Sequence, residues 1–378
     1  MKKWNILHRQ EPSRNDLMES MSIPEEIGQI LLNRGVETQD QVKMFTDPSL
    51  KYLRDPFQLK DMDRAVERMR RAISENEKIW IFGDYDVDGV SSTSIMILYF
   101  KSIGYPVDYY IPNRLEEGYG LNTEAIDHIA SKDGSLIITV DCGITSVKEV
   151  DYAKDLGIDV IITDHHECQE KLPDAYAVVD PKRDDSSYPF EGICGCGVAF
   201  KLIHALSGNE EFYRNINRYL EIVSLATICD IMPILDENRI IVKNGMEILG
   251  QGNNLGMQAL LEVCGLDGTK IKSSHLGFAI GPRINASGRL GFSKLGVELF
   301  TSDSLEEAKS LALMMDSKNT ERQEVEARIH MEVEDILSKD TSYRDDKVLV
   351  ISGKDWHHGI IGIVASKVTE KYYKPCIL

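Results

Sequence analysis

Short apolar runs alternate with amphipathic stretches through the middle of the chain. The runs that predict buried strands are 79–82, 107–111, 136–140, 159–163 and 177–179. Helical patterning separates them, around 95–100, 123–130 and 145–156. Alternation of this kind is typical of βαβ units, in which the strands run parallel and helices cover the sheet. The pattern therefore predicts an α/β fold built on a doubly wound parallel sheet.

The regions on either side of this alternation have helical patterning. Residues 1–75 are polar and helical in pattern, and residues 197–250 are mostly helical. A long polar helix is expected to begin at Ser304, where the sequence has the spacing of a capping box, and to reach about Leu337. A helix of this length is a candidate spacer between two domains.

The last residues begin a second α/β pattern, with a strand at 347–351, a helix at 360–372 and a further strand from Pro375. About 30 residues bury too little apolar surface to stand alone, so we expect a C-terminal truncation. The expected parts are a helical N-terminal extension (1–75), a central domain (76–300), a spacer helix (301–345) and an incomplete second α/β domain (346–378).

The composition narrows the class of protein. The 378 residues include 61 Asp and Glu against 43 Lys and Arg, which gives a formal net charge of −18. A hydrophobic fraction of 42 % is typical of a globular protein, not of a disordered one. The acidity argues against a protein that holds nucleic acid through an extended basic surface. It leaves open a protein that holds metal ions in a carboxylate cluster.

Cysteine usage and the apolar runs indicate the compartment. No apolar signal-peptide core follows Met1, and runs such as 95–98 are too short to span a bilayer. The seven scattered cysteines do not suggest a disulfide framework. Cys194 and Cys196 are interpreted as buried thiols in a Gly-rich turn, because no second close pair accompanies them. We expect a cytoplasmic protein without a membrane partner.

Acidic residues and histidines follow three of the predicted strands. They are Asp84, Asp86 and Asp88 after the first strand, Asp141 after the third, and Asp164, His165, His166 and Glu167 after the fourth. The carboxyl ends of parallel strands meet at one edge, where ligands bind. Gathered carboxylates repel one another unless a cation neutralises them. The sequence therefore predicts a divalent metal site with two ions, Mn²⁺ or, where carboxylates dominate, Mg²⁺.

Each of these segments also has a plainer interpretation. A single Asp after a strand often caps the next helix, and a His pair there is often structural. The spacing of Asp84, Asp86 and Asp88 is similar to that of an EF-hand loop, but Ile95 stands at the twelfth position, which requires Glu. The convergence of three segments favours the metal site.

A second group of candidate residues is basic. Residues 281–291 combine glycines with Arg283, Asn285, Ser287 and Arg289. Glycine lets a backbone approach an anion and Arg binds phosphate bidentately, although composition alone would equally fit a surface turn. Arg114 follows the second strand and should lie at the same edge. Metal ions beside arginines favour hydrolysis of a phosphoester by two-metal catalysis.

Together these segments resemble the DHH phosphoesterase family. Residues 84–89, 140–143 and 164–166 match its first three motifs, and residues 229–233 resemble the fourth. Residues 356–366 resemble the opening of its accessory DHHA1 domain. The resemblance extends from about residue 45 to the end and is closest to the bacterial exonucleases of this family that are specific for single-stranded DNA. It identifies 76–300 with the DHH catalytic domain and 346–378 with the start of DHHA1.

The resemblance implies processive 5′-to-3′ hydrolysis of single-stranded DNA to mononucleotides in DNA repair and recombination, with single-strand-binding protein and a helicase as possible partners. It implies metal ligation by Asp86, Asp88, Asp141, His165 and Asp230, with Asp141 bridging. The catalytic set would be Asp84, which orients ligands, Asp141, His165, and His166 at the scissile phosphate. The substrate would be held by Arg114, Arg283, Asn285, Ser287, Arg289 and His357.

One departure and two alternatives accompany this resemblance. Phe82 stands where related pyrophosphatases have a ligand His, which disfavours a pyrophosphatase and leaves one metal with fewer ligands. The first alternative is a DHH phosphodiesterase acting on short oligoribonucleotides or cyclic dinucleotides, and the long spacer helix disfavours it. The second is a metal-free DHH-like replication scaffold, and the presence of every candidate ligand disfavours it. Later DHHA1 motifs and an OB-fold would lie beyond Leu378, so weak DNA binding is expected.

Overall fold

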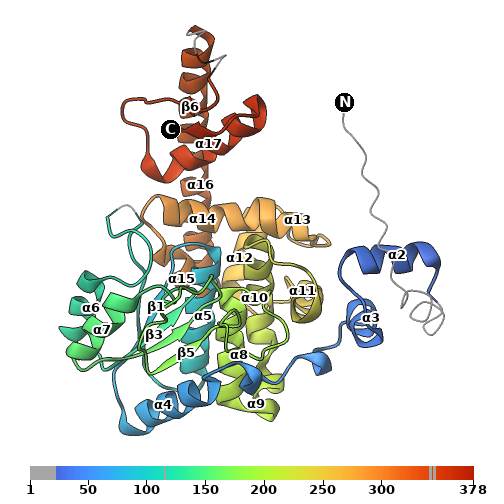
Figure 1. Cartoon of the computed structure of the whole chain (residues 1–378), viewed down its shortest axis with the longest axis vertical. Helices are drawn as coiled ribbons and strands as arrows, with labels where there is room; N and C mark the ends of the chain where they lie inside the picture. Colours follow the sequence, from blue (N-terminus) through green and yellow to red (C-terminus); the bar gives the residue numbers. More distant parts are fainter. Residues whose placement is uncertain (1–22, 115, 340–342, 344–345) are drawn as a thin grey trace.

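The computed structural model describes residues 23–114, 116–339, 343 and 346–378. The parts of the predicted N-terminal extension and spacer that fall on 1–22, 340–342 and 344–345 lie outside the described residues. Figure 1 shows a central α/β body with an N-terminal helical segment beside it, and a long helix that rises from the body to a small C-terminal unit.

A five-stranded parallel sheet with the order β2-β1-β3-β4-β5 forms the centre of the body. The strands are β1 (Ile79–Gly83), β2 (Asp108–Tyr110), β3 (Leu136–Val140), β4 (Asp159–Thr163) and β5 (Ala177–Val179). They confirm the predicted doubly wound sheet. The strand order reverses between β1 and β3, and such a switch point is where open α/β sheets bind ligands.

Helices cover both faces of the sheet. Ile79 and Ile81 of β1 pack into the larger core, and Trp80 and Phe82 pack into the core on the other face, because successive side chains alternate along a strand. The helices of the larger core include α4 (Met62–Glu75), α5 (Val87–Ser102) and α8 (Gly195–Ser207). The other face is covered by α6 (Thr123–Ala130) and α7 (Val147–Asp155).

Further helices flank this body (Figure 1). Before the sheet come α2 (Glu25–Asn33), α3 (Gln39–Thr46) and the short turns η1 (Leu50–Tyr52) and η2 (Pro56–Gln58). After α8 come α9 (Asn209–Asn215), α10 (Asn217–Cys229), α11 (Asp236–Ile248), α12 (Leu255–Val263), α13 (Ser273–His275), the π-helical η3 (Leu276–Ile280), α14 (Gly281–Arg289) and α15 (Lys294–Thr301).

The predicted long helix is α16 (Leu305–Lys339), which joins the body to the C-terminal unit. Ala308 and Met315 of its first half belong to the core of the body, while Ile329 and Val333 of its second half pack in a separate cluster. That cluster includes residues of α17 (His358–Tyr372) and of the parallel pair β6 (Leu349–Val350) and β7 (Cys376–Ile377). These elements match the C-terminal pattern, and the division into four domains remains a prediction.

The segment 281–291 is not the loop or turn that its composition suggested. It forms α14, with Pro282 in the first turn, where proline is favoured. A Cβ on Gly288 would lie 2.2 Å from the backbone oxygen of Tyr85, and one on Gly281 would lie 2.5 Å from Cys229 Sγ. The glycines therefore let this helix approach the loop after β1 and the end of α10.

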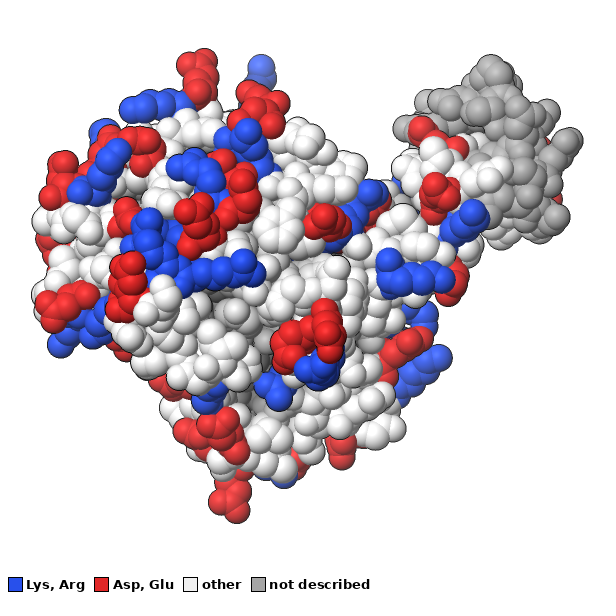
Figure 2. Space-filling view, turned by 90° about the horizontal axis from the view of Figure 1, so that it is seen from below, with Lys and Arg blue, Asp and Glu red and all other residues white. Residues whose placement is uncertain are grey.

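The surface carries charges of both signs. Figure 2 shows one face of the molecule, on which Lys and Arg side chains are interspersed with Asp and Glu. None of the helices among the described residues combines the length and the apolar character needed to cross a membrane.

Candidate metal centre

The loops at the carboxyl edge of β1, β3 and β4, together with the end of α10, bring acidic and histidine side chains to one place. Three groups of side chains could each hold a metal ion. Within each group, one ligand atom from each residue lies within 4.8 Å of the others. The groups are Asp84, Asp86 and Asp141; Asp88, His165 and Asp230; and Asp141, His165 and His166. The structure thus assembles all the residues that the sequence proposed as ligands.

His165 lies at the middle of this cluster. Its Nε2 atom is 3.1 Å from Asp141 Oδ1, 3.6 Å from Asp88 Oδ2 and 3.7 Å from Asp230 Oδ2. Within the described part of the chain, Asp84 Oδ1 and Asp141 Oδ1 are buried without a hydrogen-bond partner. Buried acceptors are normally satisfied, so oxygens that converge without donors fit a divalent cation.

The electrostatics of the cluster also fit a cation. Burial and neighbouring carboxylates raise the pKa of Asp84 to about 8 and that of Asp141 well above its usual value. The same causes raise the pKa values of Asp88 and Asp230 to about 6. Burial lowers the pKa of His165, which favours the neutral ring that binds metals. Two divalent ions would offset this excess of negative charge.

Local backbone structure aims these side chains. Asp86 caps α5, because its Oδ1 accepts from the amides of Asp88 (2.9 Å) and Gly89 (3.1 Å). The plain helix-cap interpretation therefore holds for one oxygen of Asp86. Asp141 has a φ of +61°, in the left-handed region that few non-glycine residues adopt. Strain of this kind tends to occur at functional sites.

The first residues of α8 hold Asp88 of the cluster in place. The amides of Gly195 and Cys196 donate to the two oxygens of Asp88, at 2.7 and 2.8 Å. A Cβ on Gly195 would lie 2.4 Å from Asp141 Oδ1, so a residue other than glycine would collide with Asp141 here. The buried thiols of Cys194 and Cys196 are confirmed, but they lie at a helix N-terminus and not in a turn. Sequence reasoning missed the role of these amides.

Asp164 and His166 form a unit beside the cluster. Asp164 accepts from the backbone of Ile144 (2.9 Å) and from His166 Nδ1 (2.7 Å). Burial alone would raise the pKa of Asp164, but these hydrogen bonds hold it below its usual value. The bond to Asp164 in turn raises the pKa of His166 to about 8. The exposed ring of His166 is therefore positively charged at neutral pH.

Tyr119 was not foreseen, because the sequence around it has no recognisable pattern. Its hydroxyl lies 3.3 Å from His166 Nδ1 and 3.4 Å from the backbone oxygen of Asp141. Its ring also packs edge-on against that of Tyr85. Tyr119 therefore lines the open side of the cluster.

Two of the predicted arginines lie next to the cluster. The guanidinium of Arg114 lies 4.9 Å from the centre of the Tyr85 ring. Arg289 donates to the backbone oxygen of Gly359 (3.0 Å), and burial together with the charges of Arg114 and Arg322 lowers its pKa. Arg322 of α16 is thus a third guanidinium in this region, and the sequence gave no reason to single it out.

The remaining predicted substrate contacts have mixed outcomes. His357 caps α17 by accepting from Gly359 (3.1 Å), which places it near Arg289. Asn285 accepts from the amide of Val87 (3.2 Å), so it steadies the loop after β1. Asn285 thus lies beside the loop that carries Asp86, and His357 lies beside Gly359, the contact of Arg289.

Three residues are not available for the roles that the sequence suggested. Arg283 is bound to Asp316 (Nε–Oδ1, 2.9 Å) and to the backbone oxygen of Ala279, so its guanidinium is already paired. Ser287 is fully buried and donates to Ile284 within its own helix. Glu167 is exposed, is paired with Lys182 and belongs to none of the three ligand groups.

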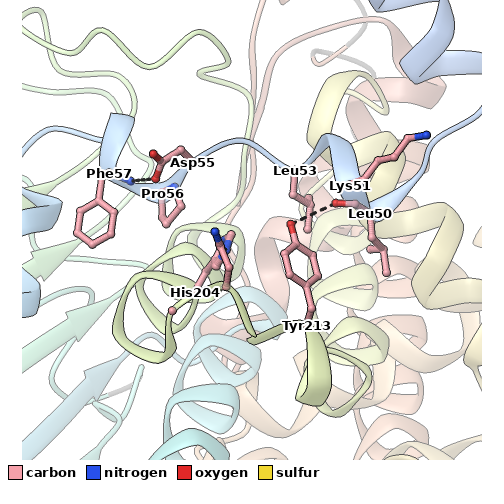
Figure 3. A pocket seen from close by; sticks show the side chains of 10 residues that line it. Leu50, Lys51, Leu53, Asp55, Pro56, Phe57, His204 and Tyr213 are labelled. Atoms are coloured by element: carbon pink, nitrogen blue, oxygen red, sulfur yellow. Dashed lines mark hydrogen bonds between the residues drawn. The ribbon is translucent and has the colours of Figure 1, made fainter. Parts of the chain in front are cut away.

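A cavity lies at the other end of α8. It has a volume of about 690 Å³ and is lined by the segment 50–57 and the far end of α8. Figure 3 shows His204 between Pro56 and Tyr213, whose hydroxyl donates to Leu50 (3.4 Å). Because α8 begins at the metal cluster and has 13 residues, this cavity is about 20 Å away. We therefore place the chemistry at the cluster and not in the cavity.

Comparison with known proteins agrees with the geometry. Residues 78–227 match the DHH family, N-terminal domain. Over 376 residues, covering 100 % of this chain and 47 % of the relative, the chain is 39 % identical to the single-stranded-DNA-specific exonuclease RecJ of Bacillus subtilis. It is 35 % identical to RecJ of Salmonella typhimurium, covering 100 % of this chain and 67 % of that protein.

A solved structure gives the same result. A crystal structure of exonuclease RecJ bound to manganese matches with a TM-score of 0.74 and 31 % identity, covering 84 % of this chain and 79 % of that chain. The chain spans about half to two thirds of the length of the curated relatives named above. On its motifs, fold and sequence identity, the chain belongs to the RecJ family of DHH proteins.

Proposed function

We propose that this chain carries the catalytic centre of a 5′-to-3′ exonuclease that hydrolyses single-stranded DNA to mononucleotides. The observation that carries the proposal is the cluster of carboxylates and His165, in which Asp84 Oδ1 and Asp141 Oδ1 are buried without a donor among the described residues. The names of the relatives, single-stranded-DNA-specific exonucleases, support the substrate. The manganese-bound relative supports Mn²⁺, with Mg²⁺ as the alternative ion.

The cluster would hold two ions. We assign the ligand role to Asp86, Asp88, Asp141, His165 and Asp230, with Asp141 between the two ions and Asp84 orienting the others. When bound, such ions activate water and stabilise the leaving oxygen of a phosphodiester. The amides of Gly195 and Cys196 keep Asp88 in place, so this ligand is positioned before a metal arrives.

The other residues would act on the substrate directly. His166 is charged at neutral pH and can donate a hydrogen bond to an oxygen of the scissile phosphate. Asp164 and Tyr119 fix the direction of its ring. Arg114 and Arg289 would hold a neighbouring phosphate, because charge-assisted bonds from guanidinium groups suit phosphate oxygens.

The cellular setting is part of the proposal. A single-strand exonuclease of this family would serve repair and recombination in the cytoplasm, with single-strand-binding protein and a helicase as partners. The polypeptide beyond this chain, in relatives of greater length, would add further contacts to DNA.

The decisive experiment follows 5′-labelled and 3′-labelled single strands with the whole chain and Mn²⁺. We expect labelled mononucleotides to appear first from the 5′ end, and no product after chelation of the metal. Asp174→Asn, a change in an exposed ion pair with Lys154 beside the start of β4, serves as the matched control for Asp141→Asn. A protein that binds Mn²⁺ in calorimetry yet degrades neither DNA nor RNA strands would overturn the proposal. Faster cleavage of dinucleotides than of long strands would favour the short-substrate phosphodiesterase.

A further inference from the structure

Ile231 is an outlier in two respects. It follows Asp230 at the end of α10 and has a φ of +57°, a left-handed conformation that is strained for a β-branched residue. Glycine normally occupies such a position after a helix. The side chain of Ile231 is also 88 % exposed, so it contributes almost nothing to the core.

Phe278 is a second large apolar side chain with no packing role. It is 86 % exposed and lies on η3, the five-residue π-helical segment. Irregular turns of this kind occur frequently at functional sites, because the regular helix would be more stable. A phenylalanine exposed to this degree gains no burial energy in the isolated chain.

Ile231 and Phe278 come from neighbouring elements. Cys229 Sγ lies 3.6 Å from the backbone oxygen of Leu276, and a Cβ on Gly277 would lie 3.8 Å from Ile228. The first turn of η3 thus packs on the last turn of α10, directly before Asp230. Ile231 therefore directly follows a candidate metal ligand, and Phe278 belongs to the segment that packs on the same end of α10.

The position of the pair suggests its occupant. Ile231 directly follows the candidate ligand Asp230, so their Cα atoms are about 3.8 Å apart. A phosphodiester bound at the metal cluster carries bases within reach of this surface. Bases offer flat apolar faces, which exposed apolar and aromatic side chains contact without regard to sequence.

We propose that Ile231 and Phe278 contact the nucleobases of the strand whose phosphate lies at the metal cluster. This inference rests on the proposed function and adds to it a base-contacting surface. It explains why a strained, exposed isoleucine stands where glycine would cost nothing. Bases inside a duplex are stacked on each other, so their faces are not available to the pair. The contact therefore favours single strands.

The test compares a single strand that carries bases with an abasic strand of the same length. Binding is measured by fluorescence anisotropy in the Asp141→Asn background, so that hydrolysis does not consume the probe. We expect Ile231→Gly and Phe278→Ala each to weaken binding of the base-bearing strand about tenfold, with about twofold or smaller change for the abasic strand. The double variant should lose the preference for bases.

Two matched controls separate this contact from a structural role. Asp133 is also exposed with a left-handed φ of +58°, and Phe57 is also exposed, but both lie away from the cluster. Asp133→Gly and Phe57→Ala should leave both affinities unchanged. Ile231→Gly should be at least as stable to urea as the parent, because glycine relieves the strain.

Each outcome decides. Equal weakening of both strands would overturn the inference and indicate a contact with the backbone or a structural defect. Unchanged binding of both strands would also overturn it and point to a surface that other protein covers. If the preference for bases is present and lost in the variants, but the unmutated centre hydrolyses no strand, the base contact stands and the proposed exonuclease function fails.

Discussion

Buried acidic side chains have different surroundings in the metal cluster and in the helical region around Glu237. Around Asp141 the carboxylates face one another, and the pKa values of Asp84, Asp88, Asp141 and Asp230 are raised. Behind the sheet, Glu237 is equally buried but accepts from Lys201 Nζ (2.6 Å), from the amide of Arg54 (2.8 Å) and from Tyr188. The facing carboxylates of the cluster repel one another, whereas Glu237 is paired with a cationic side chain.

A second paired network makes the same contrast. Arg68 is 4 % exposed and binds both oxygens of Glu77 and one of Asp159. Removing one partner of such a buried pair would leave an isolated charge, which is costly, so these networks should be sensitive to substitution. Among the described residues no Lys or Arg side chain binds the facing carboxylates of Asp84 and Asp141, and divalent ions would supply this compensation. A buried acid held by a cationic side chain, such as Glu237, thus differs from buried acids that face one another, such as Asp84 and Asp141.

The largest expected effect concerns Asp141→Asn. Removing a ligand shared by the two ions should lower the rate of strand hydrolysis by about 10³-fold or more. The metal-free protein should not lose stability, because one repelling carboxylate is gone. Steady-state kinetics and urea unfolding of the same preparation check both halves. A destabilised but active variant would contradict the assignment.

Glu237→Gln should show the reverse behaviour. It leaves Lys201 buried without its counter-charge, so the free energy of unfolding should fall by about 3 kcal/mol. Hydrolysis per folded molecule should be unchanged, since Glu237 lies in the region behind the sheet. Urea unfolding together with active-site titration measures the two quantities. Loss of activity without loss of stability would show that Glu237 serves the reaction and not the stability of the fold.

The pH dependence of the metal-free protein should follow from the raised carboxyl pKa values. Asp84, Asp88 and Asp230 have folded pKa values of about 8, 6 and 6, above their usual values, so the folded state binds more protons than the unfolded state. The free energy of unfolding should therefore fall as pH rises from about 5 to 8.

Saturating Mn²⁺ should remove this fall, and at about 100 times its Kd it should add about 2.7 kcal/mol at neutral pH. Thermal unfolding over a pH series, with and without the ion, provides the measurement. A metal-free protein that becomes more stable toward pH 8 would contradict the raised pKa values of these carboxyl groups.

Arg114→Ala should have a moderate effect confined to substrate affinity. The loss of one charge-assisted phosphate contact should raise KM about tenfold and lower the salt dependence of binding by about one ion. Kinetics at several salt concentrations check this, with Lys51→Ala as a control on the remote cavity. An effect on kcat alone would place Arg114 at the reacting phosphate instead.

Arg283→Ala should have the smallest effect. Because Arg283 is paired with Asp316, its loss should reduce stability by about 0.5 kcal/mol and leave strand affinity within about twofold. Anisotropy and urea unfolding measure the two changes. A tenfold loss of affinity would show that Arg283 contacts a phosphate despite its pairing with Asp316.

Much of the fold was predictable because its signals are local. Apolar runs with helical stretches between them specified all five strands, and the order of the parallel sheet then brings the residues after β1, β3 and β4 to one edge. For this reason Asp86, Asp141 and His165 could be selected from the sequence before any coordinates.

The errors have a common physical cause. In residues 281–291 the glycines suggested a flexible, anion-binding segment, whereas Gly281 and Gly288 are needed for close helix packing. Composition cannot tell a glycine that frees the backbone from one that clears space for a neighbour. The pairing of Arg283 with Asp316 depends on where α16 packs, which no local pattern reveals. Tyr119 and the amides of α8 were missed for the same reason.

The long helix α16 has a mechanical consequence. Its 35 residues span about 52 Å, with Ala308 and Met315 fixed in the body and Ile329 and Val333 fixed in the C-terminal cluster. A tilt of about 5° at its base would displace the far end by about 4.5 Å. The helix therefore amplifies small shifts: the packing of Ala308 and Ala312 in the body fixes the direction in which the C-terminal cluster is held.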